Sequence, residues 1–157
     1  MKPIYFLLAL VMLSCNNTTS NTDTTTQPVP KEKAVLNKTY VEPHNGYSEA
    51  VAIKANGIKT IYISGQVGEG ATFEAQFRDA LNKLLKTLKV SGATFDDVVK
   101  YNTYIVNYSP EMLPAFRAVR KELMGDTDMP ASTLVGVEAL GLESWGVEIE
   151  AIAVLAD

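Results

Sequence analysis

The chain has 157 residues, of which 46% are hydrophobic and 20% charged, enough for one folded domain and an extension. Its formal net charge of −4 and the lack of any Lys/Arg run argue against a nucleic-acid partner, because phosphate binding needs a basic surface. One cysteine, Cys15, and one histidine, His44, exclude an intrachain disulfide and argue against a zinc or copper site, so we expect no metal and no cofactor.

The first fifteen residues are typical of a bacterial export signal. An apolar run over residues 4–13 is too short to span a bilayer but fits the hydrophobic region of a signal peptide. It ends in Met-Leu-Ser-Cys at Cys15, which resembles a lipobox, where the signal is cut before a cysteine that is then lipidated. We therefore expect residues 1–15 to be a lipoprotein-type signal peptide. The protein would then be exported and lipid-anchored at Cys15, on the periplasmic side of a bacterial membrane; a plain signal peptide with an incidental cysteine is the alternative.

A tether is expected to follow over residues 16–33. This segment is rich in Thr, Asn and Ser and has almost no large apolar side chain. It cannot bury enough surface to offset its chain entropy, so we expect it to be disordered. The folded domain is then expected over residues 34–157.

The domain is predicted to begin with a hairpin and a helix. Residues 50–54 and 59–64 are strand-like, and Asn56-Gly57 between them favours a type I′ turn, whose two central residues both need positive φ. Apolar residues then recur at helical spacing over residues 73–88, and Thr72 is placed to cap that helix.

The second half predicts a strand, a helix and two further strands. Residues 98–106 are rich in β-branched residues and tyrosine, which favours a buried strand. Ser109-Pro110 is typical of a helix start, and apolar spacing carries that helix to Gly125. The order β-β-α-β-α-β-β predicts an α+β fold with one sheet and two helices on one face. Because several strands are apolar on both sides, including residues 149–155, we also expect a homo-oligomer that covers the other face.

Five short motifs are spread along the domain. They are Gly46-Tyr47-Ser48, Tyr62-Ile63-Ser64-Gly65-Gln66-Val67, Asp96-Asp97-Val98-Val99-Lys100, Pro130-Ala131-Ser132-Thr133 and Val147-Glu148-Ile149-Glu150-Ala151-Ile152-Ala153-Val154. Together they resemble the Rid family, also called YjgF or RutC-like and formerly endoribonuclease L-PSP. The resemblance implies a chorismate-mutase-like fold and a homotrimer with three clefts between neighbouring subunits. The acidic balance of the chain gives the endoribonuclease label no support.

The resemblance also implies a small-molecule site. Characterised Rid proteins hydrolyse reactive enamine or imine acids to 2-keto acids and ammonia. By the same resemblance, Glu148 is the catalytic residue that positions or activates water, and Tyr47, Ser64 and Gly65 line the cleft. Trp145, in the loop before the last strand, is either a platform for a ligand or an anchor for its loop.

One position departs from the deaminating members. They carry an arginine for the substrate carboxylate where this chain has Ser132, which is followed by Thr133. Serine offers one neutral hydroxyl instead of a charged bidentate fork. Arg117 and Arg120 on the second helix are the candidates for a replacement cation, although both also fit an ordinary helix surface.

Three interpretations therefore stay open, and the sequence leaves undecided whether the protein is an enzyme. The first is a Rid protein that binds a small polar metabolite in its clefts, with divergent hydrolase chemistry. The second is an enamine/imine deaminase that uses another group for the missing arginine. The third is a non-catalytic trimeric binding module. His44 lies in a turn-like Glu-Pro-His-Asn-Gly stretch and is predicted to be an exposed loop residue rather than part of a Ser-His-Asp triad.

Overall fold

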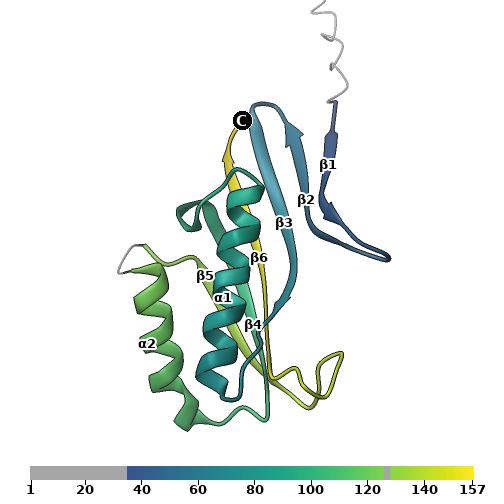
Figure 1. Ribbon diagram of the computed structural model, residues 1–157. Coiled ribbons are helices and arrows are strands. Elements are labelled where there is room, and N and C mark those ends of the chain that lie inside the picture. Colours follow the sequence, from purple (N-terminus) through teal and green to yellow (C-terminus); the bar gives the residue numbers. More distant parts are fainter. Residues whose placement is uncertain (1–34, 126–127) are drawn as a thin grey trace, which may run out of the picture. The chain divides into compact units, whose positions relative to one another are not determined.

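Six strands form one sheet that carries both α-helices on one face (Figure 1). The elements are β1 (Asn37–Pro43), β2 (Ser48–Ala55), β3 (Ile58–Val67), α1 (Phe73–Val90), β4 (Val98–Val106), α2 (Leu113–Met124), β5 (Ala131–Val137) and β6 (Val147–Ala156). Short 3-10 helices, η1 (Phe95–Asp97) and η2 (Pro110–Met112), precede β4 and α2. The strand order is β1-β2-β3-β6-β4-β5, and only the β4–β5 pair among them is parallel. The predicted α+β class, with two helices on one face of a single sheet, is confirmed.

This computed structural model describes residues 35–125 and 128–157. The expected signal peptide over residues 1–15, with Cys15, and the expected tether over residues 16–33 lie outside the described residues. Within the described ranges, neither α-helix has the length and apolar character needed to cross a bilayer.

Local sequence signals act where they were expected. Asn56 and Gly57 have φ of 52° and 74°, so the hairpin between β2 and β3 has the positive φ angles that a type I′ turn requires. Thr72 caps α1 by accepting a hydrogen bond from the backbone N–H of Ala75 at 3.2 Å. Pro110 begins the 3-10 turn that leads into α2.

The edge strand β1 was not among the strands expected from the sequence. Its seven residues are almost entirely exposed, and only Val41 is partly buried. The strand forms because its backbone pairs antiparallel with β2, in a register that sets Tyr40 opposite Val51. Backbone pairing, rather than an apolar face, therefore creates this element, and hydrophobic periodicity carries no signal for it.

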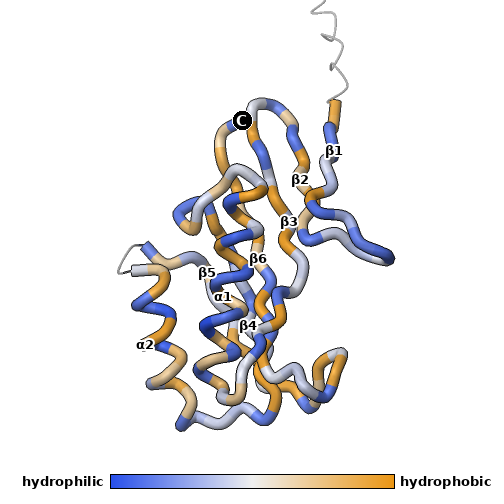
Figure 2. The backbone as a smooth tube through the Cα atoms, in the orientation of Figure 1, coloured by the Kyte–Doolittle hydropathy of each residue, from blue (hydrophilic) through white to orange (hydrophobic). Residues whose placement is uncertain are grey.

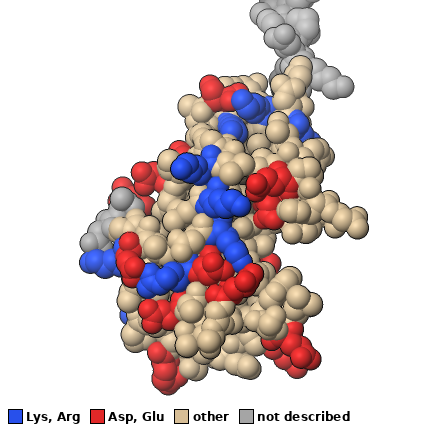
Figure 3. All heavy atoms as spheres, viewed as in Figure 1, with Lys and Arg blue, Asp and Glu red and all other residues tan. Residues whose placement is uncertain are grey.

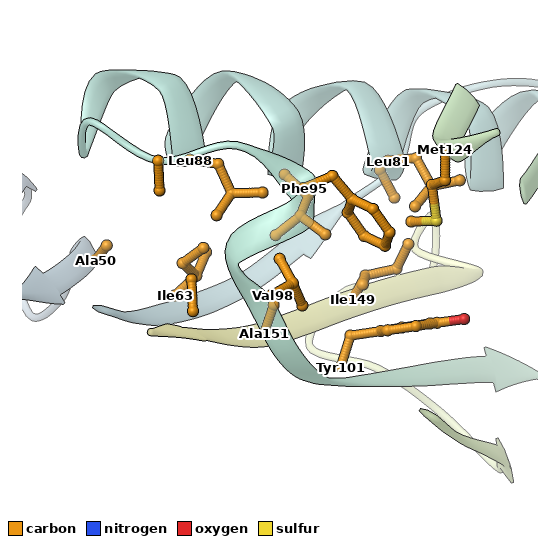
Figure 4. Packing of buried hydrophobic residues seen from close by; sticks show 14 of the residues in the cluster. Ala50, Ile63, Leu81, Leu88, Phe95, Val98, Tyr101, Met124, Ile149 and Ala151 are labelled. Carbon is orange, nitrogen blue, oxygen red and sulfur yellow. The ribbon is translucent and has the colours of Figure 1, made fainter. Parts of the chain in front are cut away.

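The core lies between α1 and the central strands (Figure 4). The outer surface of α1 is largely hydrophilic, while its inner surface is apolar (Figure 2). The buried side chains that meet at this interface include Phe77, Leu81, Leu84 and Leu88 of α1, Ile61 and Ile63 of β3, and Ile149, Ala151 and Ala153 of β6. Each large side chain among them contributes about 1.5–3 kcal/mol when fully buried, so this interface holds β3 and β6 rigidly beneath α1.

The opposite face of the sheet has no covering element in the described part of the chain. A cross-strand row of Tyr40, Val51, Tyr62 and Ile152 runs over it, and Tyr40 and Tyr62 are 62% and 48% exposed. A hollow of about 180 Å³ next to this row is lined in part by Tyr62, Ile152 and Glu150. The covering of this face by further copies of the chain stays a prediction.

Candidate functional site

The pairing of β3 with β6 is interrupted near the end of β3. Ile63 pairs with Ala151, and the next partners are Gln66 and Ile149, so β3 holds one residue more than β6 in this interval. As a result Ile63 and Gln66 are both buried although they are three residues apart. Such bulges redirect the strand locally and are common beside functional sites.

A cleft of about 710 Å³ opens at this bulge. This volume lies within the range of small-molecule sites. Its lining comes from the β1–β2 turn region, the end of β3 and the loop after it, the C-terminal half of α1, and the start of β6 with the loop before it. The lining residues are Glu42, His44, Tyr47, Glu49, Ser64, Gly65, Gln66, Val67, Glu69, Lys83, Lys86, Thr87, Trp145 and Glu148. Four of the predicted site residues, Tyr47, Ser64, Gly65 and Glu148, are thus brought together.

Glu148 is the one carboxylate of the cleft wall that β6 supplies. Its side chain is half-buried, and the described residues give it neither a hydrogen bond nor an ion pair. Burial raises the pKa of the Glu148 carboxyl, and the nearby charge of Glu150 raises it further. A carboxyl in this condition exchanges protons closer to neutrality than an ordinary glutamate, which suits acid–base work on a bound ligand.

Gly65 makes the position of Glu148 possible. A Cβ atom at residue 65 would overlap Oε1 of Glu148, so the carboxylate lies directly against the β3 backbone. Gly65 has no positive φ, and its lack of a side chain serves close approach rather than backbone conformation.

Glu150 belongs to a different environment although it is two residues from Glu148. It accepts hydrogen bonds from Asn102 Nδ2 at 2.7 Å and from the Tyr104 hydroxyl at 2.8 Å. The bond to Glu150 is the main cause of the raised pKa of Tyr104. Glu150 is therefore held within the uncovered face of the sheet, and it acts on the cleft only through its charge.

A hydrogen-bonded network supports the wall formed by β3. Ser64 Oγ donates to the backbone carbonyl of Ser48 at 2.6 Å. The buried amide of Gln66 donates to Glu49 Oε2 at 2.9 Å and accepts from Thr87 Oγ1 at 3.3 Å. The network ties β2, β3 and α1 together at the base of the cleft.

His44 is exposed, as predicted, and its side chain lies in the cleft, which the sequence did not indicate. Its ring stacks on Tyr47 with centroids 4.8 Å apart, and its Nε2 lies 2.9 Å from Glu49 Oε1. Tyr47 and Glu49 are only three and five residues away in the sequence, but the geometry of the turn that brings their side chains to the ring is set by the pairing of β1 with β2. The turn-like composition around His44 was the only signal near it.

Two lysines of α1 supply the positive charge of the cleft. Lys83 Nζ donates to the Val67 carbonyl at 2.9 Å and forms ion pairs with Asp79 and Glu69 at 3.0 and 3.2 Å. Lys86 is exposed and has no hydrogen bond or ion pair with any described residue. A band of Lys and Arg side chains runs over α1, with acidic side chains on either side of it (Figure 3).

Trp145 completes the cleft wall before β6. Its loop is fastened to α1 by Gln76, whose Oε1 accepts a hydrogen bond from the Gly146 N–H at 2.9 Å. The amide nitrogen of Gln76 donates to the Gly70 carbonyl in the loop before α1. Trp145 is half-buried and packs against Gly141, where a Cβ would collide with its ring. The residue is thus a loop anchor that also contributes to the cleft lining.

The other predicted site residues lie elsewhere in this chain. Ser132 and Thr133 are exposed on the edge strand β5, opposite Tyr101 and Asn102 of β4. Arg117 is exposed on α2, and Arg120 lies over the ring of Phe116 at 5.7 Å. None of these four lines the cleft of a single chain. In the described ranges, no group of three or more His, Cys, Asp and Glu side chains is arranged to hold a metal ion.

Comparison with known families gives a match over nearly the whole domain. The family model described as endoribonuclease L-PSP matches residues 37–155. This match includes β1 to β5 in full, β6 up to Leu155 and all lining residues of the cleft.

Individual relatives agree with the family match. The chain is 32% identical over 122 residues to a 2-iminobutanoate/2-iminopropanoate deaminase from Dermatophagoides farinae, covering 73% of this chain and 89% of that protein. It is 32% identical over 120 residues to the RutC family protein YjgH from Escherichia coli strain K12, covering 70% and 87%. A crystal structure of a member of the YjgF/YER057c/UK114 family from Mycobacterium tuberculosis superposes with a TM-score of 0.63 at 30% identity, covering 76% of this chain and all of the other.

Proposed function

Because the chain belongs to the endoribonuclease L-PSP family, which is the YjgF or Rid family, we propose that it binds a small polar metabolite beside Glu148 and hydrolyses a carbon–nitrogen double bond in it. The substrate class is an enamine or imine, by analogy with the deaminase from Dermatophagoides farinae. Fold and family alone do not determine an activity, so the proposal depends on the site.

The observation that carries the proposal is the condition of Glu148. It is half-buried in the wall of an open cleft, its pKa is raised, and no described side chain competes for its oxygens. A carboxylate held in this way orders a water molecule and takes its proton. The backbone at Gly65 keeps the carboxylate in place from behind.

The reaction adds water across the double bond and then expels the nitrogen. The water oxygen bonds to the imine carbon, its proton passes to Glu148, and the electron pair of the C=N bond moves to nitrogen, which takes a proton. The nitrogen of the resulting carbinolamine then takes the proton held on Glu148, the hydroxyl proton is lost, and the C–N bond breaks. One imine and one water thus give one carbonyl compound and one ammonia.

Lys86 replaces an arginine as the cation for an anionic group of the ligand. It lines the same cleft as Glu148 and is free of described partners, whereas Lys83 is already paired with Asp79 and Glu69. An ammonium group binds a carboxylate as a point charge rather than through a bidentate fork, so we expect weaker selection of the ligand's orientation.

An RNA substrate fits the cleft poorly. The lining holds four glutamates, Glu42, Glu49, Glu69 and Glu148, against two lysines. Phosphate groups need a basic surface, and the whole chain carries a formal net charge of −4.

We also propose that the uncovered face of the sheet is the contact between copies in a homotrimer. The row of Tyr40, Val51, Tyr62 and Ile152 offers apolar surface for such a contact. In this arrangement β5 of one copy brings Ser132 and Thr133 to the cleft of its neighbour, so these two residues, which lie outside the cleft of a single chain, would share a site with Glu148.

For the N-terminal segment, we propose cleavage before Cys15 and a lipid anchor at that residue, which places the protein on the periplasmic side of a bacterial membrane. The support is the apolar run over residues 4–13, which ends at the lone cysteine of the chain.

The second candidate is ligand binding without turnover, which the serine at position 132 favours. The deciding experiment measures formation of 2-keto acid from 2-iminopropanoate by the full chain, beside Glu148→Gln and Ser132→Arg. Turnover that Glu148→Gln abolishes supports the hydrolase. Binding of pyruvate by a wild type that shows no turnover supports the binding module. A wild type that shows no binding and no turnover contradicts both candidate functions. A gain in Ser132→Arg shows that β5 of a neighbour reaches the cleft.

A further inference from the structure

The imidazole of His44 is held in one orientation at the cleft. The turn between β1 and β2 is closed by a hydrogen bond from the His44 N–H to the Tyr47 carbonyl at 2.8 Å. The ring stacks on Tyr47 with an interplanar angle of 27°. Its Nε2 is 2.9 Å from Glu49 Oε1, although half of the side chain is open to solvent. These two contacts fix the orientation of a ring that is otherwise exposed to solvent.

Glu49 is in turn fixed from the interior. Its Oε2 accepts a hydrogen bond from Gln66 Nε2 at 2.9 Å, and Gln66 Oε1 accepts one from Thr87 Oγ1 at 3.3 Å. Gln66 and Thr87 are only 5% and 3% exposed. The two oxygens of Glu49 therefore have separate roles: one is bound to the protein interior and the other to the histidine.

This geometry determines which nitrogen of the His44 ring can exchange a proton with a ligand. An ionised carboxylate only accepts hydrogen bonds, so Nε2 of His44 carries the proton toward Glu49. Nδ1 has no partner among the described residues. When both ring nitrogens are protonated, Nδ1–H is the donor left for a bound molecule.

We propose that His44, oriented by Glu49, is a second acid–base group of the cleft and gives the proton that the imine nitrogen takes. The inference depends on the proposed hydrolysis, which needs one group to accept a proton from water and another to protonate nitrogen. The charged or titratable groups that share the cleft with the ring are Tyr47, Glu49, Glu42, Glu69, Lys83, Lys86 and Glu148.

The proton balance closes over one turnover. When water adds, Glu148 takes its proton and His44 Nδ1–H protonates the nitrogen, which leaves a neutral imidazole and a protonated carboxyl. When the carbinolamine breaks down, the Glu148 proton moves to nitrogen, the C–N bond breaks, and the hydroxyl proton returns to His44. Ammonia leaves, and both groups are restored.

The first test reads the ring directly. His44 is the only histidine of the chain, so the imidazole ¹⁵N signals of the full chain need no assignment. We expect the neutral ring to be protonated at Nε2, and Glu49→Gln to weaken that preference. A neutral ring protonated at Nδ1 in the wild type would overturn the inference whatever the activity.

The second test measures kcat and KM against pH for 2-iminopropanoate. Glutamine at residue 44 keeps an amide donor for Glu49 but carries no proton, so His44→Gln should lower kcat by about 10²-fold, remove the alkaline limb and leave KM little changed. Glu49→Gln should also lower kcat, because the ring loses the carboxylate that orients it. Asn45→Ala, in the same turn but outside the lining, is the control for loop effects.

The outcomes separate the two proposals. If the wild type turns over and His44→Gln keeps both its rate and its alkaline limb, the role of His44 is wrong while the hydrolase stands. If the wild type does not turn over the imine, both the proposed function and this inference fall. If His44→Gln and Asn45→Ala lose activity equally, the effect comes from the turn, and the proton-transfer role is rejected.

Discussion

The carboxylate of Glu148 occupies the space that a side chain at Gly65 would need. Two strands contribute to this contact: β6 brings the glutamate, and the bulge of β3 brings the glycine. A side chain at residue 65 would meet the end of the flexible Glu148 side chain rather than backbone. It should therefore displace the Glu148 carboxylate and leave the fold unchanged.

Replacing Gly65 tests this relationship. We expect Gly65→Ala to push the Glu148 carboxylate away from the β3 backbone and to lower kcat for imine hydrolysis by about 10²-fold, the scale of a misplaced catalytic group. The melting temperature should change little, because φ at residue 65 is not positive. A variant with wild-type kcat would show that the position of Glu148 does not matter.

Because the pKa of Glu148 is raised, replacing its carboxyl by a neutral amide should stabilise the folded protein in a pH-dependent way. Above the ordinary glutamate value of 4.5, the folded state favours the protonated form more than the unfolded state does. The stability of the wild type therefore falls as pH rises from 4.5 through the raised pKa. Glu148→Gln lacks this loss and should be more stable at neutral pH and equal at pH 4. Because the side chain is only half-buried, we expect a gain below about 1 kcal/mol.

Urea unfolding of both proteins at pH 4 and pH 7.5 measures this difference. Glu138→Gln, which alters an exposed glutamate outside the cleft, is the matched control and should show no such pH dependence. An equal difference at both pH values would contradict a titration of Glu148 and point to altered packing instead.

The elements that local chemistry specifies could be predicted from the sequence. Asn56-Gly57 can form its turn without distant partners, and Thr72 caps α1 through a neighbour three residues away. The structure also brings motifs carried by single strands, Ser64-Gly65 and Glu148, into the lining of one cleft. Each of these features can be recognised from a few consecutive residues.

The remainder of the cleft depends on long-range assembly. Gln66 reaches Glu49 because a bulge moves it to the buried side of β3, which an alternating pattern does not reveal. Lys86 is an exposed residue of α1 that lines the cleft, and the sequence does not show which side of this helix borders the cleft. The predicted replacement cations, Arg117 and Arg120, lie on α2 instead. His44 was assigned to a loop correctly, but its role depends on residues from three other elements.

The attachment of α2 rests on a stacked aromatic pair. Phe116 is buried, and its ring lies 4.6 Å from that of Phe77 on α1. Phe116→Ala should destabilise the fold by about 3–5 kcal/mol through lost burial and a cavity. Because α2 does not line the cleft, kcat at low temperature should be retained. Denaturant unfolding checks the prediction, with the exposed Arg117→Ala as control, and a loss below about 1 kcal/mol would contradict it.

Lipidation at Cys15 predicts where the protein is found after cell fractionation. The full chain, expressed in a Gram-negative bacterium, should appear in the membrane fraction and incorporate labelled fatty acid. Cys15→Ser should lose the label, because serine offers no thiol for the lipid, while Ser20→Ala in the tether should behave as the wild type does. Unlabelled wild-type protein in the soluble cytosol would reject both export and the anchor.

Lys86 is the cation that we assign to the carboxylate of the substrate, and its loss should act on binding rather than on chemistry. Lys86→Gln removes the charge from the cleft wall while Lys83 stays tied to Val67, Asp79 and Glu69. An exposed ammonium–carboxylate contact contributes up to about 1 kcal/mol, so KM for 2-iminopropanoate should rise roughly fivefold with kcat almost unchanged. Lys89→Gln, exposed on the same helix but outside the cleft lining, should leave KM as it is.

Added salt should raise the KM of the wild type and have less effect on Lys86→Gln, because screening acts on the charge that the variant lacks. An equal rise in KM for both variants would mean that α1 attracts the substrate only through its overall charge, and a fall in kcat confined to Lys86→Gln would assign the lysine to the chemical step instead.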